Sequence, residues 1–464
     1  MADRRGAHDL GREAGPAVPA MQSTDLRAGR FSMPDYLDAG YGDRGGRARA
    51  RMSAEKMWPA PSVGRPDAAG DAVLPSDPLE RAACVALLAF AGAMQVSIAA
   101  ADILLTITAV LWIALVMRNR ERIEVPRMFW ALAAYAAATL VAAIFSVDPR
   151  VSLIDSKQLV LLIIVPIIYR LLPGKLSLTA VDVVITVGAL SATWGIIQYL
   201  ILNYDDLGRR PQGALGLYMT YSGLLMLVTC AAVARLMFAK HHRQWAALVM
   251  PALVLALAFT FTRSAWVGSC VGVGVLLLLR DFRLIALLPV AFGIFLTVAP
   301  TKLTARLYST FSLTDPSNVD RVAMMKSGFR IIKDDPLTGV GPDMIIQVYP
   351  HYRDKTAVNQ LNPHLHNVPL QIAAERGVPA LAVWLWFIVS LLRDFLRRRR
   401  EAFPSLSNAG IAVIAAMLAA GLFEYNFGDS EFLMLFLVLV TLPYAAERAP
   451  RVAAAPIVHA RRAG

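Results

Sequence analysis

Residues 214–238 read ALGLYMTYSGLLMLVTCAAVARLMF, an apolar run in which Arg235 is the one charged residue. Helices rise about 1.5 Å per residue, so a run of this length can cross the hydrocarbon core of a bilayer, which takes about 20 residues. Similar runs recur along the chain, and 56% of its residues are hydrophobic, against about 45–50% in soluble domains. The sequence therefore predicts an all-α, polytopic membrane protein.

Twelve candidate spans follow from residue 82 onwards, with the first two joined tightly near Asp102. Their expected bounds are 82–100, 102–117, 128–146, 158–172, 177–201, 214–238, 244–261, 264–279, 283–300, 378–392, 408–423 and 431–446. The loops after even-numbered spans carry most of the lysines and arginines, including the run 397–400. Because cytoplasmic loops usually carry this excess, we expect both termini in the cytoplasm.

Residues 82–446 are predicted to form one transmembrane helical bundle between two cytoplasmic tails, 1–78 and 447–464. The first tail is rich in Gly, Ala, Pro, Arg and Asp and has no apolar periodicity, which predicts disorder. A start-site error is the alternative interpretation, since Met52 and Met57 lie nearer the first span.

Charge and cysteine usage exclude several classes of protein. The net charge of +12 arises beyond residue 81, where the basic cytoplasmic loops account for it, so no nucleic-acid partner is implied. The arginine run 397–400 is interpreted as a topology signal that contacts anionic membrane lipids. Cys84, Cys230 and Cys270 lie inside apolar runs, so we expect neither a disulfide framework nor a thiolate metal site.

Residues 301–365 form a long loop between the ninth and tenth spans, on the outer side by the same charge argument. Long loops of this kind are usually functional. Val322, Met325, Phe329 and Ile332 recur at helical spacing and share one face of a predicted helix, which Pro336 ends. In the turn that follows, Gly339-Val340-Gly341 lacks the third glycine of a dinucleotide fingerprint, so no nucleotide cofactor is expected.

The stretch HNVPLQIAAERG, residues 366–377, follows this loop directly. Pro369 suits the first turn of a helix, and Gly377 suits a left-handed cap at its end. His366 then lies just before a helix N-terminus, which disfavours imidazolium and leaves the neutral ring that a general base requires. The alternative is a loop histidine that only hydrogen-bonds backbone. His364 is a weaker candidate, and a His364/His366 metal pair is not favoured without further ligands.

Several arginines are candidates for binding phosphate oxygens, which guanidinium groups hold in bidentate fashion. Arg263 lies between two apolar runs with almost no loop; the alternative role is snorkelling to the interface. Arg209 and Arg210 follow the fifth span; the alternative is a solvated pair beside acidic neighbours. Arg321 opens the loop helix; the alternative is a helix-surface charge. Together with His366, these residues suit an anionic, lipid-linked substrate such as a polyprenyl pyrophosphate.

These segments, in this order, resemble the O-antigen ligase and polymerase superfamily of bacterial surface-glycan assembly, over roughly residues 82–446. His366-Asn367 followed by Gly377 is similar to the ligase signature, and Glu375-Arg376-Gly377 to its Glu-x-Gly turn. Thr262 to Gly268 resembles the family's Ser/Thr-Arg-Gly/Ser-x-Trp segment. Arg321 followed by Pro336 to Pro342 resembles its Arg…Pro-Leu-Thr-Gly-x-Gly loop. The chain departs from the pattern near Met324 and Met325, where a tryptophan is expected, and at Pro369, where an aromatic residue is common.

The resemblance implies a GT-C-type fold with twelve spans and a periplasmic loop over the site, in the bacterial inner membrane. It implies glycan transfer from undecaprenyl pyrophosphate to an acceptor, without metal or other cofactor. His366 matches the proposed catalytic histidine and Arg263 the arginine proposed to bind pyrophosphate. Arg209 or Arg210 matches a second such arginine by loop position. Further candidates for the site are Arg321, for pyrophosphate, and Asn367, His364 and Glu375 in supporting roles.

Three functions remain open from the sequence. The first is a ligase that joins O-antigen to lipid A–core. The second is a polymerase that extends an O-antigen or exopolysaccharide chain on the same carrier. The third is a twelve-span transporter, which would place ionisable groups near the midplane. Here the charged residues lie mainly at the outer ends of spans, with Asp182 as the main exception. This distribution favours the ligase and the polymerase over the transporter.

Overall fold

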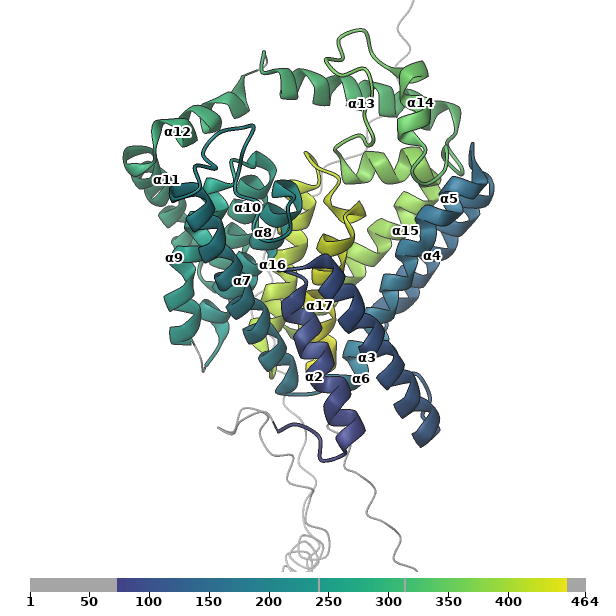
Figure 1. The fold of residues 1–464 in the computed structure, drawn as a ribbon, viewed down its shortest axis with the longest axis vertical. Helices are drawn as coiled ribbons and strands as arrows, with labels where there is room; N and C mark the ends of the chain where they lie inside the picture. Colours follow the sequence, from purple (N-terminus) through teal and green to yellow (C-terminus); the bar gives the residue numbers. More distant parts are fainter. Residues whose placement is uncertain (1–72, 241–242, 313, 449–464) are drawn as a thin grey trace, which may run out of the picture. The chain divides into compact units, whose positions relative to one another are not determined.

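The computed structural model describes residues 73–240, 243–312 and 314–448. Every regular element in these ranges is helical, as the sequence predicts. The predicted tails, 1–78 and 447–464, fall almost entirely outside the described residues. The elements (Figure 1) are α2 Pro78–Ala93, α3 Ile98–Asn119, α4 Met128–Ile144, α5 Pro149–Asp155, η1 Ser156–Ile163, α6 Ile164–Leu171, α7 Leu176–Leu200, α8 Tyr218–Phe238, α9 Arg243–Phe259, α10 Arg263–Arg280, η2 Phe282–Ala286, α11 Leu287–Val298, α12 Thr301–Tyr308, η3 Ser309–Phe311, α13 Pro316–Asp334, α14 Ile345–Tyr352, α15 Val368–Arg398, α16 Pro404–Ala420, η4 Asn426–Gly428 and α17 Ser430–Ala446.

Six helical segments of the described chain are long and apolar enough to cross a membrane: Ile98–Asn119, Pro149–Leu171, Leu176–Leu200, Tyr218–Phe238, Arg263–Arg280 and Val368–Arg398. Five shorter apolar helices accompany them, at Met128–Ile144, Arg243–Phe259, Phe282–Val298, Pro404–Ala420 and Ser430–Ala446. Each of the twelve predicted spans overlaps a helix. The chain is thus a helical membrane protein, while the count of twelve spans and the GT-C fold stay predictions.

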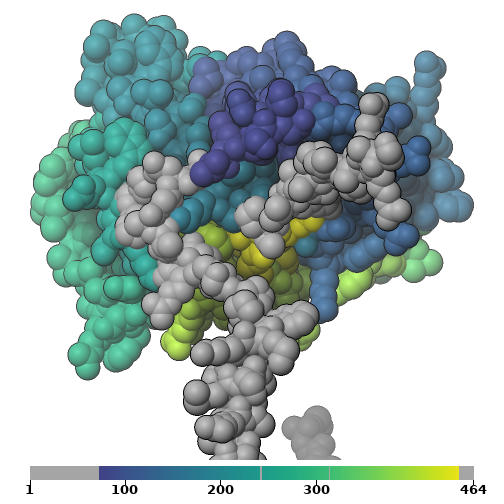
Figure 2. All heavy atoms as spheres, turned by 90° about the horizontal axis from the view of Figure 1, so that it is seen from below, coloured from purple at the N-terminus to yellow at the C-terminus, as the bar shows by residue number. Residues whose placement is uncertain are grey.

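The first two helices break earlier than the sequence predicts. The predicted junction lay near Asp102, but Asp102 is inside α3, and α2 already ends at Ala93. Ser97 accounts for the difference, because its hydroxyl accepts a hydrogen bond from the Ala100 backbone N–H and caps α3. The α2–α3 hairpin lies at the surface of the face drawn in Figure 2, in purple to dark blue.

α17 lies at the centre of the bundle. Every residue from Phe432 to Ala446 is buried, as expected for a helix that is apolar on all sides. α16 packs against α17 and also against α8 and α10 (Figure 1). Added Cβ atoms on Gly268 and Gly272 of α10 would lie within 3 Å of carbonyl oxygens of α16. These glycines therefore allow the close helix contact that their spacing predicts.

The predicted loop 301–365 folds into α12, α13 and α14, with a small core that it shares with Leu370 and Ala374 of α15. The apolar face that the sequence pattern singled out on α13 remains exposed: Val322, Met325 and Phe329 are 49%, 45% and 61% accessible. A different face is buried, because its small residues allow close packing. At Gly328, an added Cβ would lie 2.7 Å from the side chain of Leu370 in α15.

α15 is broken at Gly377, where φ is 81° and ψ is 165°. The positive φ agrees with the glycine cap expected from the sequence, and a second helical segment continues after the break. The carbonyls of Ala374 and Glu375, at the end of the first segment, accept hydrogen bonds from the N–H groups of Val340 and Gly341 at 3.0 and 2.9 Å. The loop turn thus satisfies backbone acceptors that a helix end leaves open.

We expect Gly377→Ala to lower the free energy of unfolding by about 2 kcal/mol or more. An added Cβ would lie 2.1 Å from the Leu337 carbonyl oxygen, in a backbone conformation that is essentially restricted to glycine. Thermal unfolding of the purified protein in detergent measures the change. Gly293→Ala in α11 is the control, because nothing lies within 4 Å of its added Cβ. Equal unfolding midpoints for the two variants would contradict the claim that the break in α15 requires glycine at position 377.

Candidate functional site

His366 occupies a fixed position before the first segment of α15. Asn367 caps this helix through its side-chain oxygen, which accepts from the Leu370 N–H at 2.9 Å. His366 itself has a positive φ of 48°, which is uncommon for a residue with a side chain and is retained where surrounding contacts fix it. Asn367 therefore caps the helix that follows His366, and its supporting role in the site stays a prediction.

The loop between α16 and α17 is bonded to this helix start. The Asn367 amide donates to the Leu422 carbonyl at 3.1 Å, and the Val368 N–H donates to the Gly421 carbonyl at 2.6 Å. These bonds bring Glu424 beside the histidines. Its Oε1 lies 2.9 Å from His366 Nδ1 and 3.6 Å from His364 Nε2. The sequence analysis did not identify Glu424.

Glu424 is a charged group in a largely buried place, with 14% of its side chain exposed. Burial by itself would raise the pKa of this carboxyl, but its close contacts with His364 and His366 lower the pKa well below its ordinary value. A carboxylate at Nδ1 favours the tautomer that has its proton on Nδ1. This leaves Nε2 of His366 as the nitrogen that can accept a proton from a substrate.

Four arginines line one cavity of about 330 Å³ together with His366 and Glu424. We call this the arginine cavity; its cations are Arg210, Arg263, Arg306 and Arg321. Asp320 and Glu424 are the carboxylates among its lining residues. The cavity therefore carries an excess of positive charge and suits an anionic ligand.

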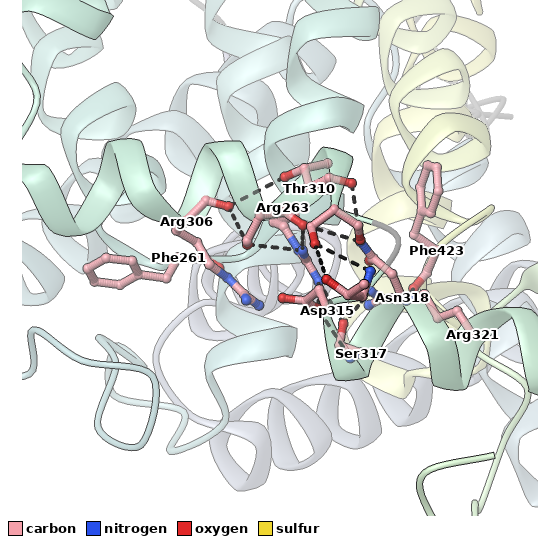
Figure 3. A network of polar contacts seen from close by, with 12 residues as sticks. Phe261, Arg263, Arg306, Thr310, Asp315, Ser317, Asn318, Arg321 and Phe423 are labelled. Carbon is pink, nitrogen blue, oxygen red and sulfur yellow. Dashed lines mark hydrogen bonds and ion pairs between the residues drawn. The ribbon is translucent and has the colours of Figure 1, made fainter. Parts of the chain in front are cut away.

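Arg263 is the most strongly bonded of the four (Figure 3). Its Nη1 donates to the Ser309 carbonyl at 2.9 Å, and its Nη2 donates to the Ser317 hydroxyl at 2.6 Å. Nη2 also forms an ion pair with Asp315 at 3.3 Å. Asp315 caps α13. Arg263 thus fastens the start of α10 to the loop, and its guanidinium is already occupied by protein groups.

The other three guanidinium groups have fewer protein partners that neutralise charge. Arg321 donates to the Phe423 carbonyl and the Ser317 hydroxyl, and Nε of Arg306 donates to the Phe261 carbonyl at 3.4 Å (Figure 3). Arg210 stacks over the Tyr218 ring at 4.2 Å.

Burial and neighbouring cations both lower the pKa values of arginines in this cavity. Burial, with repulsion from Arg263 and Arg210, lowers the pKa of Arg306 to about 10. Burial also lowers the pKa of Arg210 and Arg321, and Arg263 lowers each of them further. A bound anion would relieve this repulsion between like charges.

A second cavity, of about 470 Å³, adjoins the first and shares Tyr218, Met219 and Glu424 with it. We call it the carboxylate cavity, because six acidic side chains line it: Asp155, Asp343, Glu375, Glu424, Asp429 and Glu431. The basic side chains in its lining are His364 and Arg376.

The structure brings together most of the residues that the sequence singles out, in two groups. His366, Arg210, Arg263 and Arg321 line the arginine cavity, whereas His364 and Glu375 line the carboxylate cavity. Arg209 lies outside both groups of lining residues and stacks on Tyr204 at 4.3 Å. Of the two neighbouring arginines, Arg210 is thus the one that lines a cavity with His366, and a role of either in binding pyrophosphate stays a prediction.

Arg306 and Glu424 are the site residues that sequence reasoning missed. Each carried a weak signal. Glu424 is an acid in the short connection between two apolar runs, and Arg306 lies in the loop that the topology places beside Arg263.

The two histidines and Glu424 also have the composition of a metal site. One ligand atom from each of His364, His366 and Glu424 lies within 4.8 Å of the others. Imidazole and carboxylate groups are suitable zinc ligands. The hydrogen bond between Nδ1 of His366 and Glu424 accounts for the same proximity without an ion, and the sequence analysis predicts no metal.

Comparison with known families agrees with the resemblance stated above. Residues 248–385 match the family model described as O-antigen ligase, which supports a relationship of this part of the chain to an O-antigen ligase-like family. Members of this family are membrane glycosyltransferase-like enzymes that act on polysaccharide and lipid-linked substrates. No curated protein matches the chain. The matched range contains Arg263, Arg306, Arg321 and His366, whereas Arg210 and Glu424 lie outside it.

We expect Glu424→Gln to destabilise the protein by roughly 1–2 kcal/mol at neutral pH, through loss of the hydrogen bond between its carboxylate and His366 and of the charge beside His364. The pKa of Glu424 in the folded protein lies below its ordinary value of 4.5. Its contribution is therefore complete above pH 4.5 and is lost as the pH falls through the folded pKa. Unfolding midpoints of wild type and variant should converge as the pH is lowered through this window. A difference that is constant with pH would show that the charge of Glu424 is not what stabilises the fold.

Removal of divalent metal is expected to leave activity unchanged. Protein that has been dialysed against EDTA and then assayed in the presence of the chelator should transfer glycan at the untreated rate, because His366 and Glu424 satisfy each other directly. Metal content should be measured on the same sample. Loss of activity that stoichiometric Zn²⁺ restores would instead assign His364, His366 and Glu424 as metal ligands.

Proposed function

We propose that this protein transfers a glycan from an undecaprenyl-pyrophosphate carrier to an acceptor hydroxyl at the periplasmic face of the bacterial inner membrane, most consistently as an O-antigen ligase acting on lipid A–core. The observation that carries the proposal is the arginine cavity, in which an excess of guanidinium groups faces the His366–Glu424 pair. The O-antigen ligase match supports the same class of reaction.

The arginine cavity suits the leaving group of this reaction. A pyrophosphate gains negative charge as its bond to the sugar breaks, and fixed cations stabilise that charge. Arg210, Arg306 and Arg321 carry guanidinium groups that lie in the cavity and have few charge-neutralising partners. Arg263 contributes its charge to the cavity while its nitrogens hold the loop through Ser309, Asp315 and Ser317.

His366 would act as the general base. The acceptor hydroxyl oxygen forms a bond to the anomeric carbon, and the bond from that carbon to the pyrophosphate oxygen breaks. The hydroxyl proton passes to Nε2 of His366, while Glu424 holds the Nδ1 proton and stabilises the imidazolium that forms. The bonding electron pair leaves with undecaprenyl pyrophosphate. Positioned proton transfer of this kind contributes about 10²–10⁴-fold.

The proposed membrane orientation follows from the basic loops. The ends of α10 and α15 that carry Arg263 and His366 face away from the predicted cytoplasmic run 397–400. Both then lie on the periplasmic side, where the O-antigen carrier is available. We propose cytoplasmic termini on the same grounds.

We expect His366→Ala to abolish transfer, with a loss of about 10² or more. Glu424→Gln should retain an intermediate activity, because the ring remains but its orientation and tautomer are no longer fixed. The assay expresses each variant at matched membrane levels in a host that lacks its own ligase, followed by lipopolysaccharide gels. His351→Ala is the matched control, since His351 lies in α14 and lines neither cavity.

The same gels distinguish the candidate functions. Laddering on lipid A–core by wild type and His351→Ala, but not by His366→Ala, is the result that ligation requires. Longer carrier-linked glycan without laddering would assign a polymerase that uses the same donor site. Undiminished laddering by His366→Ala would remove His366 from the mechanism.

A further inference from the structure

The reaction needs two substrates, and the site offers two cavities of opposite charge. The arginine cavity and the carboxylate cavity meet at Tyr218, Met219 and Glu424. His366 lines the first and His364 lines the second, and their rings lie 4.3 Å apart. A group held in the carboxylate cavity would therefore adjoin the proposed base.

Acidic side chains outnumber basic ones in the lining of the carboxylate cavity, which disfavours an anionic ligand there. Burial raises the pKa of Asp343, and the nearby Asp155 raises it further, whereas Arg376 lowers it. Arg376 is already paired with Glu375 at 2.7 Å. A pyrophosphate placed here would lie beside Asp155 and Asp343, whereas the arginine cavity offers cations, so we assign the donor's charged group to the arginine cavity.

Two buried polar atoms in the lining of the carboxylate cavity lack hydrogen-bond partners among the described residues. They are Nε of Arg376 and Oδ1 of Asn426, in side chains that are 6% and 8% exposed. One is a donor and the other an acceptor. Buried groups of this kind are normally satisfied, and each unmade bond is costly. A ligand that both accepts and donates would satisfy them, and sugar hydroxyls do both.

We infer that the carboxylate cavity is the subsite for the acceptor sugar, and that it selects an uncharged, hydroxyl-rich residue over one that carries phosphate or a carboxyl group. This inference rests on the proposed function. Asp343 and Asn426 are its specificity-determining residues. Hydroxyls of the acceptor donate to the carboxylates and to Oδ1 of Asn426, and Nε of Arg376 donates to a hydroxyl oxygen. The hydroxyl that reacts lies at the junction beside Glu424 and His366.

The test measures donor and acceptor KM separately. The full chain, reconstituted in liposomes, is given an undecaprenyl-pyrophosphate-linked glycan and lipid A–core with a neutral terminal sugar. Asn426→Leu should raise the acceptor KM roughly 10-fold, through the lost acceptor atom, and leave the donor KM unchanged. Arg321→Gln, in the other cavity, should raise the donor KM and spare the acceptor KM. A general structural defect would raise both KM values, whereas loss of one binding contact raises only the KM of the substrate concerned.

A second variant tests the charge selection. Asp343 has a positive φ of 61°, a conformation that Asn also adopts readily, so Asp343→Asn keeps the backbone unstrained. Against lipid A–core that bears a terminal phosphate, this variant should lower the acceptor KM roughly 3–10-fold relative to wild type, through removal of one nearby negative charge. Asp334→Asn is the control, because Asp334 ends α13 and lines neither cavity.

The outcomes separate the inference from the function on which it rests. If wild type transfers nothing to any acceptor, both fail. If wild type transfers glycan while Asn426→Leu leaves the acceptor KM unchanged, the acceptor subsite lies elsewhere and only the inference fails. A wild type that uses neutral and phosphorylated acceptors equally would also overturn the inference. Should Asn426→Leu not fold, the Asp343→Asn comparison decides alone.

Discussion

The break in α15 at Gly377 is the constraint on which the site depends. A helix that ends inside a protein leaves carbonyls without donors, and here the turn Val340–Gly341 supplies N–H groups to Ala374 and Glu375. This contact fastens the loop to the bundle. It also makes residues 368–376 a short, separate helix, whose capped N-terminus presents His366 to Glu424. An unbroken helix would lack the backbone site that receives the loop turn.

The two cavities beside this helix carry opposite excesses of charged side chains. Arg210, Arg306 and Arg321 are crowded together at one side of Glu424, and a group of carboxylates lies at the other. Neither arrangement is favourable for a stable fold by itself, because like charges held together in a partly buried place repel. Such conflicts are typical of functional sites, where a substrate supplies the missing complement. Glu424 belongs to both cavities and connects them.

The sequence predicted where the helices lie better than it predicted which residues contact one another in the fold. Each predicted span overlaps a helix because the signal of an apolar run is local, and Gly377 was identified from its neighbours. The apolar periodicity of α13 predicted a helix but not which face packs against the bundle, because periodicity locates an apolar stripe and not its partner; the small residue Gly328 packs on Leu370. Glu424 lies 58 residues from His366 along the chain, so only the fold reveals their contact. The choice of Arg210 over Arg209 likewise required the three-dimensional position of the loop.

A structure of the protein with undecaprenyl pyrophosphate bound would test the central claim most directly. The account predicts that the pyrophosphate lies in the arginine cavity, within hydrogen-bonding distance of guanidinium groups of Arg210, Arg306 or Arg321, with Nε2 of His366 facing the phosphate end of the ligand. Pyrophosphate bound in the carboxylate cavity, or at a place remote from His366, would contradict the assignment of the donor site and the mechanism built on it.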